Sequence, residues 1–130
     1  MYKKILKAVI ALFCIVALFK FFSYLFYQQD DYEIIRRLSS LRLSLTLFSL
    51  NGKYTPEDPT LVWKRGYLQE VPNLKLRWRF KSNKIEIRNE FKILNTGHWA
   101  YVNNKNDKNF GLFYIDCDCK DSKGRILSKL

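Results

Sequence analysis

Residues 5–27 read ILKAVIALFCIVALFKFFSYLFY, a run in which nearly every side chain is apolar or aromatic. A helix needs about 20 consecutive apolar residues to cross a bilayer, so this run is long enough to span one. No glycine or proline occurs before Gly52, and therefore nothing in the sequence forces a break after the apolar run. The sequence predicts one long helix that starts in the membrane and ends at Asn51 and Gly52.

The charges at the two ends of this run predict its orientation. Basic residues lie at its start and acidic residues follow it: Lys3, Lys4 and Lys7, then Asp30, Asp31 and Glu33. Because basic residues favour the cytoplasmic side, we expect a cytoplasmic N-terminus and an extracytoplasmic remainder. A cleaved signal peptide has a similar start, but residues 20–27 do not supply the small-residue site that signal peptidase requires. We therefore predict an uncleaved, single-pass anchor.

The chain is long enough for one small domain beyond the membrane segment. We expect residues 1–29 to be the membrane-spanning half of the helix and residues 30–130 to form an extracytoplasmic domain. Such a domain buries only a modest core, and aromatic residues, 16% of the chain, provide large apolar areas for it. The net charge of +11 includes lysines of the membrane segment, so the domain is less basic than this total.

From residue 30 onward the apolar residues recur with the spacing of an amphipathic helix. They follow one another at alternating intervals of four and three positions: Ile34, Leu38, Leu41, Leu45 and Phe48. This spacing places them on one face of a helix, with most charged residues elsewhere. We expect this face to pack on the core of the domain. A coiled-coil partner is the alternative, although the stripe is short for one.

Residues 74–81 alternate strictly between apolar and basic side chains. The apolar set is Leu74, Leu76, Trp78 and Phe80, and the basic set is Lys75, Arg77, Arg79 and Lys81. This period of two predicts a half-buried strand, followed by a second strand at residues 84–88 in an antiparallel hairpin. Residues 98–102 and 112–115 predict two more strands. The expected fold class is α+β, a long N-terminal helix packed on a small antiparallel sheet.

Four short motifs follow one another along the chain. They are Asn51-Gly52-Lys53-Tyr54-Thr55-Pro56, Gly66-Tyr67-Leu68 before Pro72, Thr96-Gly97-His98-Trp99-Ala100-Tyr101, and a final run from Gly111-Leu112-Phe113-Tyr114-Ile115-Asp116-Cys117 to Asp121-Ser122-Lys123-Gly124. In their order and spacing they resemble the type IV pilin and type II secretion pseudopilin family. The resemblance implies a pilin-like fold in the bacterial inner membrane and a structural role in a type II secretion or type IV pilus-like assembly. It also implies other pilin or pseudopilin subunits as partners, bound through the N-terminal helix.

One departure from the family concerns the start of the helix. Family members carry a leader that ends in Gly, followed after cleavage by Thr-Leu-Ile-Glu, and this Glu pairs with the amino terminus of a neighbouring subunit. In this chain residues 1–10 contain no Gly, and no acidic residue precedes Asp30. We therefore expect a divergent minor subunit, or a pilin-like domain that stays in the membrane as a monomer.

Asp116, Asp118 and Asp121 form an acidic cluster near the carboxyl terminus. The resemblance implies a calcium site at this place in the major pseudopilins of secretion systems. Calcium takes about six to eight oxygen ligands, of which these carboxylates can supply two or three. A solvated acidic turn is the alternative. No other cofactor is expected.

Cys117 and Cys119 lie two residues apart in a domain expected outside the cytoplasm, where disulfides form and persist. A mutual disulfide closes a very small ring, so two free thiols are the alternative. A third possibility is that the two cysteines bind a metal or form an intermolecular bridge. The remaining cysteine, Cys14, lies in the apolar run.

The sequence offers little for catalysis but more for binding. His98 is the sole histidine, and no Gly-rich phosphate loop is present, so no enzymatic activity is expected. A basic strand face at Lys75, Arg77, Arg79 and Lys81 suits DNA, anionic lipid or an acidic partner, and it is also what the solvated side of a sheet looks like. The second functional hypothesis is therefore a single-pass, membrane-anchored binding module.

Overall fold

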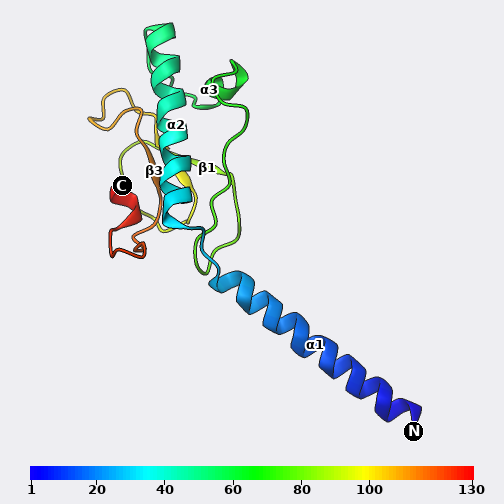
Figure 1. Ribbon diagram of the computed structural model, residues 1–130. Helices are drawn as coiled ribbons and strands as arrows, with labels where there is room; N and C mark the ends of the chain where they lie inside the picture. Colours follow the sequence, from blue (N-terminus) through cyan, green and yellow to red (C-terminus); the bar gives the residue numbers. More distant parts are fainter.

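The structure is a computed structural model that describes residues 1–130. Its elements, in chain order, are α1 (Tyr2–Phe26), α2 (Asp31–Gly52), α3 (Thr60–Lys64), β1 (Ile85–Arg88), β2 (Trp99–Val102), β3 (Phe113–Ile115) and a short terminal helix η1 (Leu127–Lys129). Helix α1 projects from a small domain in which α2 lies against the sheet (Figure 1). The layout is α+β, as the sequence predicts.

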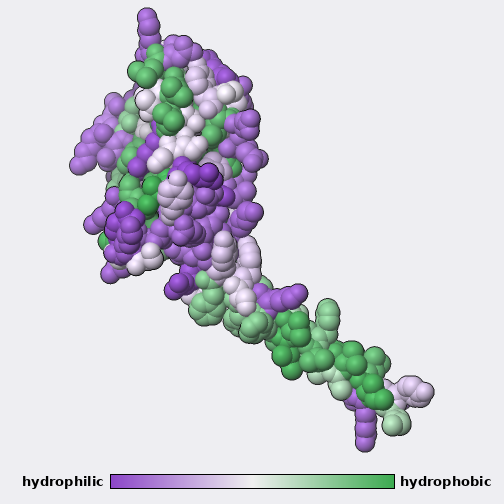
Figure 2. All heavy atoms as spheres, viewed as in Figure 1, coloured by the Kyte–Doolittle hydropathy of each residue, from purple (hydrophilic) through white to green (hydrophobic).

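Helix α1 buries none of its residues. At about 1.5 Å per residue, its 25 residues extend about 37 Å, which exceeds the roughly 30 Å of a bilayer's hydrocarbon core. By length and composition, α1 can span a membrane. Figure 2 shows the contrast with the domain, since the surface of the helix is largely hydrophobic and that of the domain is mostly hydrophilic.

The prediction of one uninterrupted helix is wrong. Helix α1 ends at Phe26 and α2 begins at Asp31, although no glycine or proline lies between them. The break has a tertiary cause. The Gln29 amide donates to the Lys75 carbonyl at 3.0 Å, and Gln29 Oε1 accepts from the Lys75 amide at 3.1 Å. Gln29 therefore pairs with a distant segment instead of continuing a helical turn.

Helix α2 packs its apolar face on the sheet, which confirms the predicted stripe. All of the predicted residues are buried in one cluster with inward-facing side chains of the sheet: Ile34, Leu38, Leu41, Leu45 and Phe48. The helix ends at Gly52, and Lys53 then adopts a left-handed conformation with a φ of 59°. Because the stripe is buried inside the domain, none of it remains for a coiled-coil partner.

The sheet has three strands in the order β1-β2-β3. Strand β1 runs parallel to β2, with Ile85 opposite Trp99, and β3 runs antiparallel to β2, with Ile115 opposite Trp99. The predicted all-antiparallel sheet is therefore wrong, and the sheet is mixed. The period of two in residues 84–88 predicts a strand correctly. It does not indicate which strand lies beside it or in which direction that strand runs.

Residues 74–81 do not form the predicted strand, so the predicted hairpin is absent. Leu74 pairs with Ser82 as an isolated bridge, and the chain between them turns at Trp78, whose φ of 61° is left-handed. In this turn the Arg79 amide donates to the Leu76 carbonyl at 3.1 Å. The φ of Trp78 lies outside the β region, and the chain reverses at this residue. Apolar and basic residues therefore alternate along the sequence here without forming a strand.

Burial along residues 74–81 also departs from the alternation. Leu74 and Leu76 are buried as predicted, but so is Lys75. Trp78 and Phe80, predicted to lie in the core, are 50% and 66% exposed. The turn after Leu76 sends these two aromatic side chains away from the sheet, toward the end of α1.

Candidate functional site

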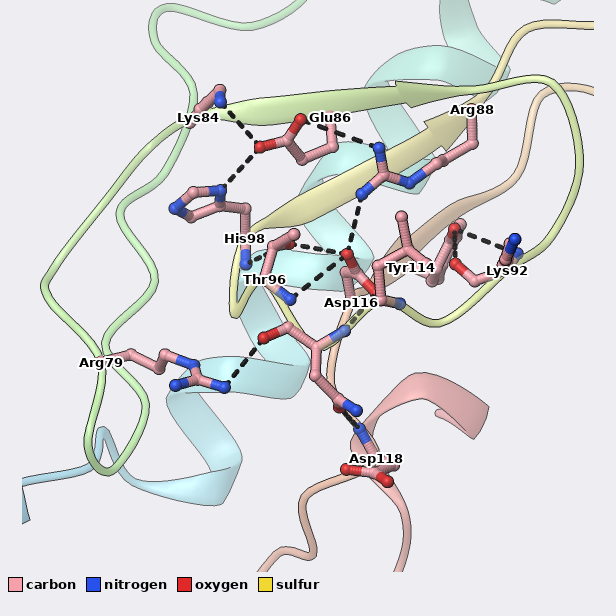
Figure 3. A network of polar contacts seen from close by, with 12 residues as sticks. Arg79, Lys84, Glu86, Arg88, Lys92, Thr96, His98, Tyr114, Asp116 and Asp118 are labelled. Atoms are coloured by element: carbon pink, nitrogen blue, oxygen red, sulfur yellow. Dashed lines mark hydrogen bonds and ion pairs between the residues drawn. The ribbon is translucent and has the colours of Figure 1, made fainter.

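Asp116 is the centre of a buried polar network that follows β3 (Figure 3). Its Oδ1 accepts hydrogen bonds from the Leu94 amide at 2.6 Å and the Asn95 amide at 3.2 Å. Its Oδ2 accepts from Thr96 Oγ1 at 2.7 Å and forms an ion pair with Arg88 Nη2 at 3.1 Å. The carboxylate therefore holds the turn before β2 in place and ties it to the end of β1.

The same contacts keep Asp116 ionised. Burial raises the pKa of its carboxyl, but hydrogen bonds from Thr96, the Leu94 amide and Arg88 outweigh burial and hold this pKa below its ordinary value. A buried carboxylate with this many donors is stabilised in its charged form. The donors are all groups of the protein, which suits a structural role.

His98 belongs to a second cluster beside this network. Its Nδ1 lies 2.9 Å from Glu86 Oε1, and Lys84 Nζ lies 2.8 Å from the same oxygen (Figure 3). Hydrogen bonds from Lys84 and His98 hold the pKa of Glu86 below its ordinary value, against the effect of burial. This cluster connects β1 with the start of β2.

The aspartates considered as calcium ligands are not brought together. Asp116 faces the turn before β2, whereas Asp121 accepts from the Arg125 amide at 2.8 Å and from Arg125 Nε at 2.7 Å within its own turn. Asp118 is exposed, and it joins the network only through its backbone amide. No group of three or more histidine, cysteine or acidic side chains is placed to hold a metal ion. The three aspartates thus make separate contacts and do not surround one common position.

Cys117 and Cys119 are joined as a disulfide, with Cα atoms 5.2 Å apart. Cys117 is buried in the core and Cys119 is half-buried, in the segment between β3 and the final turn. Cys14 is the free cysteine of the chain, and it is exposed on α1.

The predicted basic face does not form as expected, because Lys75 is buried inside the protein. Lys75 is buried, and its Nζ donates to the Tyr27 carbonyl at 2.9 Å and to the Leu76 carbonyl at 2.8 Å. Burial lowers the pKa of this ammonium group. The nitrogen instead satisfies backbone carbonyls where α1 meets the domain.

Arg79 is also tied down, by the turn that Asp116 holds. Its Nη2 donates to the Asn95 carbonyl at 2.8 Å, and a Cβ added to Gly97 would meet Arg79 Cγ at 2.8 Å. Arg77 and Lys81 remain exposed. Two of the four predicted basic residues are thus available to a partner, and their segment is hydrogen-bonded to α1 through the Trp78 and Lys81 amides.

Residues 76–81, which we call the junction loop, cap the carboxyl end of α1. The Trp78 amide donates to the Leu25 carbonyl at 2.6 Å, which is one of the terminal carbonyls that have no partner within a helix. Lys75 Nζ on the Tyr27 carbonyl adds a positive charge at this end, where the helix dipole favours a cation. Helix α1 is therefore attached to the domain through its own last turn.

Aromatic side chains of α1 and of the junction loop pack together beside these hydrogen bonds. The ring of Trp78 lies 4.3 Å from that of Phe26, and the ring of Phe80 lies 6.3 Å from that of Tyr24. Tyr24 Oη also accepts from the Lys81 amide at 2.9 Å. The junction is thus both hydrogen-bonded and aromatic.

An open pocket of about 920 Å³ lies beside the junction. It is lined by residues 28–31, 77–79 and 117–122 together with Asn95. Its acidic and basic side chains are mixed, and few of its lining residues are apolar. Pockets that bind small molecules are usually enclosed and mostly apolar, so the junction itself is the better candidate for function.

The sequence-based interpretation missed the junction because residues 74–81 read as a strand. One signal for it was present. The aromatic residues at the end of the apolar run, and Trp78 and Phe80 between basic residues, have the composition that is typical of a membrane interface. Comparison of the chain with protein-family models, with curated proteins and with solved structures finds no match.

Proposed function

We propose that the chain is a pilin-like or pseudopilin subunit, a minor structural component of a type II secretion or type IV pilus-like assembly. Helix α1 anchors it in the bacterial inner membrane, with the N-terminus in the cytoplasm and the domain outside. There α1 packs against the apolar helices of other subunits. The domain is the part presented to the secretion or pilus machinery.

The observation that carries this proposal is the unburied surface of α1. The helix buries none of its residues, and the contacts that attach it to the domain come from residues 24–27. Residues 2–23 are left to meet lipid or the helices of other subunits, since so large an apolar surface is not stable in water. One spanning helix with an external domain is the layout that the proposal requires.

The motifs that resemble pilins lie at structural boundaries, which also supports the proposal. Asn51 and Gly52 end α2. Thr96 lies in the turn that Asp116 holds before β2. In the final turn, the Ser122 amide donates to Asp31 Oδ2 at 3.0 Å, at the start of α2. Three of the four motifs thus include a residue at the end of a helix or in a hydrogen-bonded turn.

The assignment as a minor subunit follows from the charges of α1. The helix contains no acidic residue. In a fibre made of one subunit, the resemblance implies that an acidic side chain near the start of each helix pairs with the amino terminus of the next. Copies of this chain lack that pair, so we propose that it joins an assembly made mainly of other subunits.

Co-purification from membranes tests this proposal. The full chain is expressed with the pseudopilins and assembly ATPase of a type II secretion system and extracted in mild detergent. A control chain has residues 2–23 replaced by an unrelated apolar helix of the same length, so that the domain remains anchored and the contacts of residues 24–27 are kept. We expect the native chain to co-purify with pseudopilins and the control to lose most of this association.

Two results would contradict the proposal. If both chains bring down pseudopilins equally, α1 is not the contact. If neither does, although both reside in the membrane, the chain is not a subunit of that kind of assembly. Abundant fibres made of this chain alone would overturn its assignment as a minor subunit.

The alternative is an anchored module that binds DNA or an acidic partner. It was based on a basic sheet face, and Lys75 and Arg79 are instead held within the protein. Arg77 and Lys81 are too few to neutralise the many phosphates that DNA binding usually involves. The subunit hypothesis is therefore the better supported of the two.

A further inference from the structure

The junction loop exposes large aromatic side chains at the membrane end of the domain. Trp78 and Phe80 are 50% and 66% exposed, although they are packed on Phe26 and Tyr24 of α1. Trp78 also has a left-handed φ of 61°, a conformation that a bulky residue rarely adopts. The backbone is thus held in an uncommon conformation that leaves an indole ring half in solvent.

The height of this loop along α1 is fixed by hydrogen bonds. The Trp78 amide is bonded to the Leu25 carbonyl, and the Lys81 amide to Tyr24 Oη. Residues 5–26 extend about 33 Å at about 1.5 Å per residue, slightly more than the roughly 30 Å of hydrocarbon in a bilayer. When α1 spans the membrane, Leu25 therefore lies at the boundary between hydrocarbon and head groups. Figure 1 shows a loop of the domain reaching down to this end of α1.

Every charged residue of the junction loop is basic. Arg77 and Lys81 are exposed on either side of the aromatic pair. Acidic side chains do occur nearby, since the adjoining pocket is lined by Asp30, Asp31, Asp118 and Asp121. Of these, Asp31 is bonded to Ser122. The two exposed cations of the loop have no ion-pair partner within the protein, because none of its salt bridges includes them.

We propose that the junction loop is a second membrane contact, in which Trp78 and Phe80 enter the interface and Arg77 and Lys81 bind the phosphates of anionic phospholipids. The indole ring of Trp78 suits this depth because its apolar face meets acyl chains while its N–H group meets polar head groups, and the ring of Phe80 adds apolar area on the side of the acyl chains. Each basic side chain near an anionic surface adds a favourable electrostatic interaction. The proposal rests on the membrane-spanning role of α1.

The loop then sets how the domain stands on the membrane. A single helix leaves an attached domain free to tilt and rotate, whereas a helix and a loop give two points of contact. Arg79 connects the loop to the turn held by Asp116, through the Asn95 carbonyl. The orientation of the whole sheet relative to the bilayer is thereby defined, which a subunit needs for ordered packing against its neighbours.

Fluorescence quenching in vesicles tests the aromatic part. The full chain is reconstituted in phosphatidylcholine vesicles, with or without bromine on the upper part of the acyl chains, which quenches indole rings at that depth. Wild type is compared with Trp78→Phe and with the control Trp63→Phe, whose ring lies on α3, at the other end of the domain (Figure 1). Trp99 is buried and contributes a constant signal.

We expect the brominated lipid to quench wild type and Trp63→Phe, and the loss of Trp78 to remove more than half of the quenching. Equal quenching in Trp78→Phe and wild type would overturn the proposal. Near-ultraviolet circular dichroism of each variant checks that the domain is folded. Phe80→Ser provides a second variant, with weaker quenching of Trp78 expected as the loop moves outward.

The phosphate part is tested by adding anionic phosphatidylglycerol to the vesicles. We expect stronger quenching of the wild type, no such gain in the double variant Arg77→Gln and Lys81→Gln, and an unchanged gain in the control double variant Lys64→Gln and Lys108→Gln. Both control residues are exposed and lie outside the junction loop, Lys64 at the end of α3 and Lys108 between β2 and β3. If phosphatidylglycerol increases the quenching equally in both double variants, Arg77 and Lys81 do not bind lipid phosphates.

Flotation of the vesicles separates this inference from the proposed function. Protein that floats with the vesicles and resists extraction at alkaline pH has inserted α1. If it floats but Trp78 is not quenched, the loop inference alone is wrong. If it does not float, the membrane anchor, and with it the proposed subunit, is wrong.

Discussion

Replacing Asp116 by Asn removes the charge at the centre of the buried network while keeping the shape of the side chain. One oxygen remains and can accept from the Leu94 amide or from Thr96 Oγ1. The NH₂ group that replaces the other oxygen cannot accept a hydrogen bond, so the second of these two donors loses its acceptor. It also leaves Arg88 without its closest carboxylate, at 3.1 Å. The variant therefore loses both an ion pair and at least one buried hydrogen bond.

The expected loss follows from typical costs of these contacts. Removing one partner of a buried ion pair costs about 3–5 kcal/mol, and a buried donor left without a partner costs about 1–3 kcal/mol. The Arg88 side chain is 17% exposed, so water compensates part of its lost contact. We expect the free energy of unfolding to fall by about 2–4 kcal/mol.

Urea unfolding of the full chain in mild detergent measures this loss, with tryptophan fluorescence, to which buried Trp99 contributes, as the signal for the domain. Asp118→Asn is a matched control two residues away, because the Asp118 side chain is exposed and only its amide joins the network. We expect the control to change stability by less than about 0.5 kcal/mol. Similar stabilities for the two variants would refute the structural role of the Asp116 carboxylate.

The pH dependence provides an independent check. Because the pKa of Asp116 is lower in the folded chain, the carboxylate stabilises the fold above the unfolded value of about 3.9. This contribution is lost as the pH falls through the lower folded value. The free energies of unfolding of wild type and Asp116→Asn should therefore become more similar in acid. If their difference is the same at pH 7 and pH 2, the charged Asp116 carboxylate is not the source of the stability.

Three further substitutions test the core, the turn before β2 and the junction by the same unfolding assay. Leu41→Ala should cost about 2–5 kcal/mol because it leaves a cavity in the core, whereas exposed Leu43→Ala should change little; equal effects would show that α2 presents another face. Gly97→Ala and Gly66→Ala meet similar strain at φ of 73° and 80°, but only the first crowds a neighbour, at 2.8 Å, so it should be the more destabilising of the two. Lys75→Met should cost about 1–3 kcal/mol because two backbone carbonyls lose their donor; no loss would mean that solvent already satisfies them.

The parts of the fold that depend on local periodicity could be predicted from the sequence. The apolar run became α1, and the stripe from Ile34 to Phe48 is buried as expected. Both patterns are long. The apolar run is long enough to indicate a membrane helix, and the stripe repeats often enough to indicate which face of α2 is buried. Strands β2 and β3 were also located by their short apolar runs.

The parts that depend on distant contacts could not be predicted in this way. The break after Phe26 exists because Gln29 pairs with Lys75, which lies far along the chain. The alternation around Lys75 predicts a strand only if no residue takes a left-handed conformation, and Trp78 does. The residues near Phe26 and Trp78 in the sequence indicate neither the pairing of Gln29 with Lys75 nor the left-handed turn.

The same reason explains the errors at the candidate site. A basic residue on an alternating strand is expected in solvent, yet Lys75 satisfies carbonyls at the end of α1. Asp116 and Asp121 are close in sequence, but hydrogen bonds direct their carboxylates into two different turns. The spacing of residues along the chain indicated which side chains were available, and only tertiary structure determined which of them meet.

The proposed subunit requires that α1 spans the membrane with the domain outside. Protease added to intact spheroplasts tests it most directly, with the exposed thiol of Cys14 as the label for the membrane segment after digestion. We expect the domain to be digested while a short membrane-bound fragment that contains Cys14 survives. A chain that stays intact until the membrane is permeabilised, or that is found in the soluble fraction, would contradict it.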